Sequence, residues 1–544
     1  MSNFPWLTVT GAIPLVGAIV ISVLPGRSAP GADADRRARD KLVKVVALIF
    51  SLATLGVAVA MATQFKTNST QQFQFSQVYS WIPDFGVHYA VGVDGIALVL
   101  IVMSTILMPV VVLASWNDAE GATGPIGAPA PQRSVKTYFV LMLVLETMMI
   151  GVFAATDVFL FYVFFEAMLI PMYFMIGSYG VGQRQYAAVK FLLYSLLGGL
   201  LMLVAVIALY VQSIHNGHGG TFLFTSLEHL ALSPTASRWL FLGFFVGFAI
   251  KAPLWPFHTW LPDAATSAQP GAAVLLVGVL DKVGTFGMIR YCLDLFPSAA
   301  HYFTPLIIVL SVIGVLYGAV VAIGQRDLKR LIAYTSVSHM SLMTLGIFAL
   351  TSQGQAGSVL YMINHAFATG ALFLIAGFMI VRRRSHMIPD YGGVQKVAPM
   401  LAGVFLIASL AGLSLPGLNT FVSEFLVLVG TFTRYEVAAA LATVGIILAS
   451  IYMLWMYQRT MTGPVRAEVA SMPDLKAREL WAIGPLIVLI IALGVYPQPV
   501  LKIINPAVNQ TLVQVHSKDP APTAVTTGLK SRPGQHAFEK ELKR

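Results

Sequence analysis

A lysine lies in the middle of a segment that is long and apolar enough to cross a lipid bilayer. Lys251 is part of WLFLGFFVGFAIKAPLWPFHTW, residues 239–260. An ammonium group at the centre of a membrane helix costs about 2.5 to 3.5 kcal/mol on insertion scales, and such charges mark ion pathways. Pro253 and Pro256 follow the lysine, remove backbone donors and break the helix beside it. A buried charge next to a broken helix predicts a transport site.

Further ionisable side chains lie in other apolar runs, and together they form a series of carboxylates, lysines and histidines over successive spans. With Lys251, the members of this series are Glu166, Lys282, His339, His365 and Glu424. Burial and neighbouring charges shift the pKa of ionisable groups and can bring it near neutrality. The series therefore predicts a proton relay near the membrane midplane. The alternative for any single member is a buried pair that only fixes helix packing.

Two more acids in apolar runs, Glu146 and Asp281, are left without a role. Asp281 is adjacent to Lys282, so on a helix the two side chains diverge by about 100° and do not face each other. His258 is seven residues after Lys251, but the prolines between them interrupt the helical register.

The composition excludes a soluble globular protein. Of 544 residues, 57% are hydrophobic and 11% are charged, whereas soluble proteins carry about 25% charged residues. Apolar runs of roughly 20 residues occur about 14 times. The sequence therefore predicts an all-α polytopic membrane bundle of about 14 transmembrane helices. The division between the fourth and fifth spans depends on Ala155, Thr156 and Asp157 alone.

The net charge of +10 does not indicate nucleic-acid binding, because the basic residues gather in alternate loops between spans. One set of loops is rich in arginine and lysine, and the other carries only Lys66, Arg238, Arg290 and Arg434 before the C-terminal tail. The positive-inside rule places the basic set in the cytoplasm. Both termini are then outside, which requires an even number of spans.

A second interruption, at Pro416 and Gly417, shortly precedes Glu424. Paired broken spans in two halves of a chain are typical of inverted repeats with an ion site at each break. We therefore predict two inverted five-helix repeats, made of spans four to eight and nine to thirteen. The division of the chain is then N-terminal transmembrane helices (1–135), a first repeat (136–300), a second repeat (301–460), a last transmembrane helix (461–505) and a polar C-terminal tail (506–544).

The sequence lacks the common motifs for redox cofactors. Cys292 is the only cysteine, which excludes an internal disulfide, an iron–sulfur cluster and a cysteine-based zinc site. The sequence has no Gly-rich dinucleotide fingerprint and no P-loop. The energy source of the predicted relay is therefore not bound through any such motif in this chain.

Four long segments resemble the antiporter-like membrane subunits of respiratory complex I. They are DVFLFYVFFEAMLIPMY (157–173), FAIKAPLWPFHTWLPDA (248–264), QRDLKRLIAYTSVSHM (325–340) and GLSLPGLNTFVSEF (412–425). Within this family, the M-type subunits place a glutamate where this chain has Glu424, whereas the N-type and the related sodium/proton antiporter subunits usually place a lysine. The L-type subunits continue into a long lateral helix, whereas the apolar sequence here stops near Ile504.

The resemblance implies a proton-translocating subunit of NADH–quinone oxidoreductase in the bacterial inner membrane, driven by quinone reduction in other subunits. It implies Glu166 and Lys251 as a coupled first pair, Lys282 as the connecting lysine and Glu424 as the last station toward the outside. His339 and His365 are implied as groups of the central axis. No cofactor or metal is expected in this chain; FMN and iron–sulfur clusters are expected in partner subunits, and L and N antiporter-like subunits as neighbours.

Three other functions remain open from the sequence. The first is a subunit of a multisubunit Na+/H+ antiporter, against which Glu424 argues. The second is a self-contained solute carrier, against which the predominance of proton-exchanging buried side chains argues. The third is a structural subunit that transmits motion and passes no protons.

Overall fold

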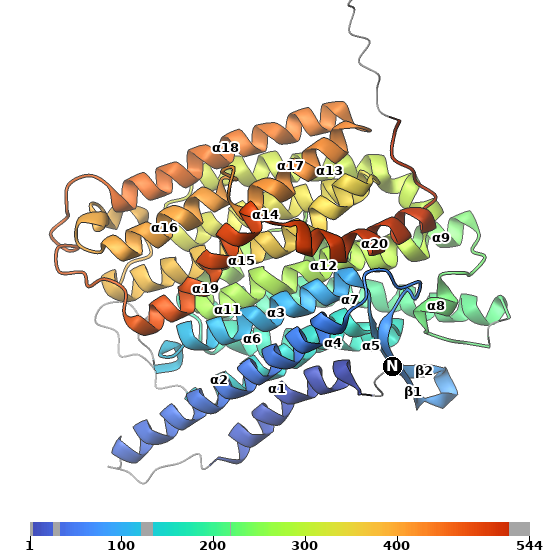
Figure 1. The fold of residues 1–544 in the computed structure, drawn as a ribbon, viewed down its shortest axis with the longest axis horizontal. Coiled ribbons are helices and arrows are strands. Elements are labelled where there is room, and N and C mark those ends of the chain that lie inside the picture. The colour runs from blue at the N-terminus through green and yellow to red at the C-terminus, as the bar shows by residue number, and fades with distance from the viewer. Residues whose placement is uncertain (1–3, 25–32, 121–133, 218, 522–544) are drawn as a thin grey trace, which may run out of the picture.

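The computed structural model describes residues 4–24, 33–120, 134–217 and 219–521 of the chain. Most of them are helical, and the helices run together along the long axis of the molecule (Figure 1). Twelve described segments are long and apolar enough to cross a membrane. They are α1 (Trp6–Val23), α2 (Asp33–Gln64), α3 (Gly95–Ala114), α4 (Val135–Ala154), α5 with α6 (Val158–Ala167 and Leu169–Gly177), α7 (Arg184–His215), α11 to η4 (Pro270–Leu293), α13 (Pro297–Ile323), α14 (Leu328–Phe348), α15 (Ser352–Arg383), α18 (Glu436–Met461) and α19 (Ala477–Val495).

Two broken spans complete the predicted number. They are α9 with α10 (Pro234–Lys251 and Trp260–Ser267) and α16 with α17 (Pro399–Gly412 and Asn419–Phe432). Added to the twelve segments, these two give the 14 spans of the prediction. Each break falls in the fourth span of a predicted repeat. The inverted relation between the two repeats stays a prediction.

A two-stranded antiparallel hairpin, β1 (Gln74–Ile82) and β2 (Val87–Val93), interrupts the described helices between α2 and α3. The helical prediction did not include it. The hairpin fixes the turn between α4 and α5, because the Thr156 N–H donates to the Ala90 carbonyl at 2.9 Å. The predicted division between the fourth and fifth spans is confirmed. Short helical turns lie in the loops: η1 (Pro83–Phe85), η2 (Asp118–Glu120), α8 (Phe224–Leu227), η5 (Ile388–Asp390) and η6 (Val394–Lys396).

The most buried spans of the bundle carry three of the predicted relay residues, Lys282, His339 and His365. In the segment from α11 to η4, all residues of the most apolar stretch are buried. The buried share of the corresponding stretch is 94% in α14, 94% in α15 and 33% in α1. The segment from α11 to η4 contains α11 (Pro270–Leu275), π-helical η3 (Leu276–Leu280), α12 (Asp281–Gly287) and π-helical η4 (Met288–Leu293). A charged group in these spans is surrounded by other side chains and not by lipid, so its neighbours decide its chemistry.

The last span is also interrupted, and it extends beyond the apolar sequence. α19 stops against the break of α16 and α17, where a Cβ on Gly494 would lie 2.4 Å from the Gly417 carbonyl oxygen. After Pro497 the chain continues as α20 (Gln498–Gln514), which packs on α3 and α15. The helix therefore runs past residue 505, because α3 and α15 cover its apolar face. Residues 522–544 of the predicted tail lie outside the described residues.

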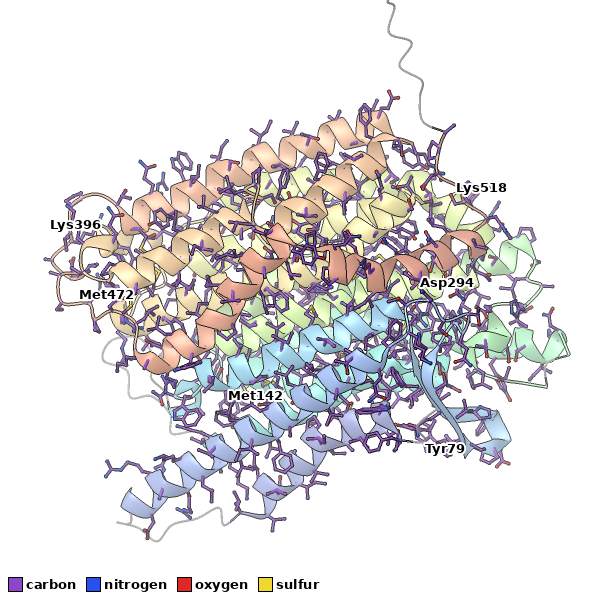
Figure 2. The ribbon with its side chains drawn as sticks, in the orientation of Figure 1. Tyr79, Met142, Asp294, Lys396, Met472 and Lys518 are labelled. Atoms are coloured by element: carbon purple, nitrogen blue, oxygen red, sulfur yellow. The ribbon has the colours of Figure 1, made fainter. Side chains whose placement is uncertain are left out.

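The two predicted sets of loops lie at opposite ends of the bundle. Figure 2 shows Lys396 and Met472 at one end, and Tyr79, Asp294 and Lys518 at the other. We name these the cytoplasmic end and the outer end, after the predicted topology.

Candidate proton-relay site

The six predicted relay residues are placed by six different helices, and five of them are almost completely buried. Glu166 lies in α5 and is half-buried. The exposed fractions of the others are 1% for Lys251 in α9, 0% for Lys282 in α12, 5% for His339 in α14, 0% for His365 in α15 and 3% for Glu424 in α17.

Lys251 is the last residue of α9, which ends where the sequence approaches Pro253. The negative end of the helix dipole stabilises a cation at this position. The ammonium nitrogen lies 5.0 Å from the ring centroid of Phe165 and 5.7 Å from that of Phe191. Aromatic faces attract cations, but they do not accept a proton. No hydrogen-bond acceptor contacts this ammonium in the described residues.

Glu166 reaches the neighbourhood of Lys251 through a pair of glycines in α7. A Cβ on Gly199 would lie 1.7 Å from Oε1 of Glu166, and a Cβ on Gly198 would lie 3.1 Å from the Gly247 Cα in α9. One glycine therefore admits the carboxylate and the other admits α9, as small residues do at membrane helix interfaces. Among the described residues, Oε1 of Glu166 and the lysine ammonium have no hydrogen-bond partner, so the two groups influence each other through space.

Lys282 is held by direct contacts. Its ammonium group donates to the carbonyl of Val277 and lies 2.7 Å from Nδ1 of His365. The π-helical η3 ends directly before α12, and such turns disturb the backbone hydrogen-bond ladder at functional sites. A protonated lysine has only donors, so Nδ1 of His365 accepts from it and the ring carries its hydrogen on Nε2.

Asp281 links the two lysines. The sequence left this residue without a role, because it cannot face Lys282 on a regular helix. Asp281 is fully buried and both carboxylate oxygens lack a hydrogen-bond partner in the described residues. Its charge interacts with that of Lys282 and with that of Lys251. Asp281 is therefore a charged group that both lysines share as a neighbour.

Tyr361 connects the histidines with Glu424. The ring of His339 is perpendicular to that of His365, with centroids 5.4 Å apart. The Tyr361 ring centroid lies 5.7 Å from that of His339 and 6.2 Å from that of His365, and its hydroxyl donates to Oε1 of Glu424. Sequence reasoning missed Tyr361. The available signal was its spacing, four residues before His365, which places both side chains on one face of a helix.

Described contacts join Lys282, His365, His339, Tyr361 and Glu424. Lys251 is related to Glu166 and Asp281 only by charge interactions through space. We call this whole set of side chains the relay line. Glu146, in α4, is fully buried and neither carboxylate oxygen has a partner among the described residues, and no described contact joins it to this line. His258 packs on Tyr317 instead, with ring centroids 4.9 Å apart.

Comparison with known proteins shows the family of the chain. A family model described as NADH:quinone oxidoreductase/Mrp antiporter, TM, matches residues 155–450. The chain is 51% identical to NADH-quinone oxidoreductase subunit M of Mycobacterium tuberculosis, over 96% of this chain and 97% of that protein.

Two solved structures have the same fold. A chain of the respiratory complex I from Thermus thermophilus with bound NADH matches with a TM-score of 0.80 and 29% identity, over 94% of this chain and 99% of that one. A chain of the Mrp complex from Dietzia sp. DQ12-45-1b matches with a TM-score of 0.77 over 93% and 99%, but at 21% identity it shows a common fold alone. The chain therefore belongs to the family of NADH:quinone oxidoreductase/Mrp antiporter membrane subunits, in its subunit M branch.

Proposed function

We propose that this chain translocates protons as the M subunit of an NADH–quinone oxidoreductase, driven by quinone reduction in other subunits. The observation that carries the proposal is the line of buried ionisable side chains from Glu166 to Glu424. Other buried charges in this protein, such as Arg290 with Asp94 (2.6 Å) and Arg382 with Glu479 (2.5 Å), are paired by direct contact, although Glu146 is buried without a partner among the described residues. The relay groups lie near one another without such closed ion pairs, which leaves them able to gain and lose protons.

The chemistry follows from the order of the groups. The negative charge of Glu166 stabilises the ammonium form of Lys251. When Glu166 is protonated this stabilisation is lost, and Lys251 gives up its proton more readily. Lys282 donates to Nδ1 of His365, and loss of a proton from Nε2 moves the charge across the ring. The Tyr361 hydroxyl then delivers a proton to Glu424, and takes a new one from the histidine side. Each step breaks one O–H or N–H bond and forms another.

The surroundings of this chain are part of the proposal. FMN and iron–sulfur clusters belong to partner subunits, and L- and N-type antiporter-like subunits lie beside it in the bacterial inner membrane with both termini outside. The relay is divided between the repeats at 136–300 and 301–460.

Mild detergent extraction tests whether this chain belongs to an NADH–quinone oxidoreductase. Co-purification with flavin and iron–sulfur subunits supports it, whereas co-purification with antiporter subunits alone would favour the Na+/H+ antiporter.

Replacement of Glu166 by glutamine mimics a permanently protonated partner. At about 7 Å and an effective dielectric constant of about 20, loss of the carboxylate charge removes about 2 kcal/mol of stabilisation from the lysine ammonium. We expect Glu166→Gln to lose most proton pumping and Glu166→Asp to keep part of it. Proton uptake into reconstituted vesicles during NADH oxidation measures both. Wild-type pumping in the glutamine variant would leave a packing role only.

Replacement of Tyr361 by phenylalanine removes the hydroxyl and keeps the ring. A buried carboxylate that loses a hydrogen-bond donor is destabilised by about 1 to 3 kcal/mol, so we expect Tyr361→Phe to assemble but to pump several-fold more slowly. Tyr452→Phe is the matched control, because its hydroxyl is buried and has no hydrogen-bond partner in the described residues. Equal pumping by the two variants would remove Tyr361 from the relay.

A further inference from the structure

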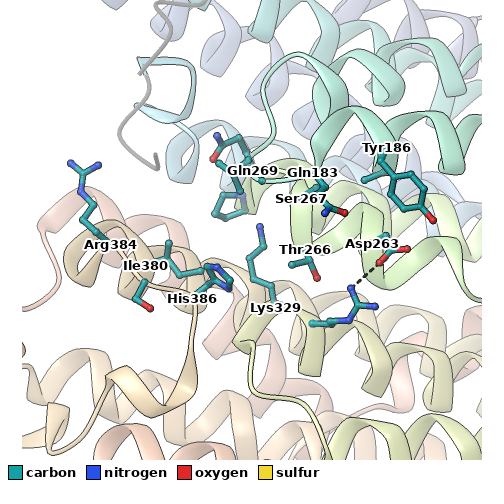
Figure 3. Close-up of a pocket in the computed structure, with 16 residues that line it drawn as sticks. Gln183, Tyr186, Asp263, Thr266, Ser267, Gln269, Lys329, Ile380, Arg384 and His386 are labelled. Carbon is teal, nitrogen blue, oxygen red and sulfur yellow. Dashed lines mark hydrogen bonds and ion pairs between the residues drawn. The ribbon is translucent and has the colours of Figure 1, made fainter. Parts of the chain in front are cut away.

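A cavity of ≈ 410 Å³ opens at the cytoplasmic end, away from the relay. Its walls come from the start of α7, the turn between α10 and α11, the start of α14 and the segment that ends α15 (Figure 3). These elements belong to both predicted repeats. An occupant of the cavity would therefore touch both halves of the protein.

The cavity carries an excess of positive charge. Asp263 is already neutralised by Lys190 at 2.7 Å and by Arg330 at 2.8 Å. His386 is hydrogen-bonded to Asp327, and this hydrogen bond raises the pKa of His386. The lining itself carries Lys329, Arg330, Arg384 and His386 against one acid, Asp263. The charged side chains that interact with this lining are Lys190 and three acids, Asp118, Asp327 and Asp390.

Lys329 supplies unused donors at the wall of the cavity. It is only 4% exposed, and its ammonium group donates to the Ala268 carbonyl at 2.5 Å. An ammonium has three donors, and that carbonyl is its one hydrogen-bond acceptor in the described part of the chain. The hydroxyl oxygen of Thr266 is buried there without a partner. Figure 3 shows Lys329 extending between Thr266 and Gln269.

An apolar stripe leads from the rim of this cavity into the membrane. On α7 the side chains of Tyr186, Val189, Leu193 and Leu197 are 59%, 44%, 59% and 59% exposed. Their spacing of three to four residues places them on one face of the helix. Tyr186 itself lines the cavity. A cationic recess at the membrane surface that continues into an exposed apolar stripe fits an amphiphile with a phosphate at its head.

We propose that this cavity binds the phosphate headgroup of an anionic phospholipid, with the acyl chains on the exposed face of α7. Inorganic phosphate shares the headgroup chemistry but makes no use of the stripe. Gln183, which is exposed and lines the cavity, and Gln185, which is exposed and does not line it, provide a matched pair of sites for an added charge. Acidic residues are compatible with both positions, because they lie at the N-terminus of α7.

The test uses the complex purified with the wild-type chain, with Gln183→Glu or with Gln185→Glu. Each is labelled with a phosphatidylglycerol that carries a diazirine near its headgroup, and the labelled peptides are identified by mass spectrometry. We expect label on residues 181–187 and 266–270, displaced by phosphatidylglycerol but not by phosphatidylcholine. An added like charge should raise the half-displacing lipid concentration about tenfold in Gln183→Glu and leave it within about twofold in Gln185→Glu.

Four results would overturn the proposal. Label absent from these peptides would show that no lipid headgroup reaches the cavity. Equal displacement by phosphatidylcholine, or an equal effect of both substitutions, would remove the requirement for an anion in this cavity. Displacement by millimolar inorganic phosphate as effective as that by phosphatidylglycerol would assign the cavity to a free phosphate and not to a lipid.

Discussion

Lys251→Arg is expected to assemble into the complex and to lose nearly all proton pumping, to below about a tenth of the wild-type rate. Arginine keeps the positive charge at the end of α9, but its guanidinium does not lose a proton in a protein. A fixed charge can therefore stabilise Glu166 without passing a proton on. If proton pumping and quinone reduction are tightly coupled, a block in pumping should also slow quinone reduction.

The measurement is NADH-driven proton uptake in reconstituted vesicles, beside a native-gel assay of assembly. Lys251→Ala controls for the bulk of the guanidinium between the Phe165 and Phe191 rings, since alanine removes the charge without adding volume. Both variants should assemble and both should fail to pump. Full pumping by an assembled Lys251→Arg complex would show that Lys251 is a fixed charge and not a relay group.

Glu424→Gln should assemble and fail to pump, whereas Glu424→Lys should retain part of the activity. If Glu424 takes up and releases protons, any titratable group at that depth can serve, and Tyr361 can accept from an ammonium as it donates to a carboxylate. The sequence resemblance implies a lysine at this place in the N-type subunits. If Glu424 were only a structural charge, Glu424→Gln would pump normally and Glu424→Lys would fail to assemble. The lysine would leave an unpaired buried charge, which costs about 3 to 5 kcal/mol.

The two assays distinguish these cases for Glu424. Pumping is read in vesicles and assembly on a native gel, with Tyr452→Phe as a substitution beside the same carboxylate. If Glu424→Lys fails to assemble while Glu424→Gln assembles and pumps normally, Glu424 is structural. The relay would then end before α17.

The amino-acid sequence determined the membrane class and the candidate residues. Apolar length alone gives 14 spans, because each crossing needs about 20 residues. The charges in these spans could be selected one by one, since a buried charge is too costly to be incidental. Pro253 and Pro416 located both breaks, because proline lacks the N–H that a helix requires. The hairpin after α2 and the helix α20 were not predicted, because both depend on cover from distant segments.

Only the tertiary structure decided which of the buried groups are neighbours, and it added Asp281 and Tyr361 to the candidates. Lys282 is 83 residues from His365, and Tyr361 is 63 residues from Glu424, so no local pattern joins them. Asp281 interacts with the charge of Lys251, which lies 30 residues earlier in α9, so the helix around Asp281 could not show this neighbour. The glycines of α7 show their function only when Glu166 and α9 lie against them. Sequence periodicity gives the faces of each helix, but contacts between helices follow from how side chains of different spans fill one common space.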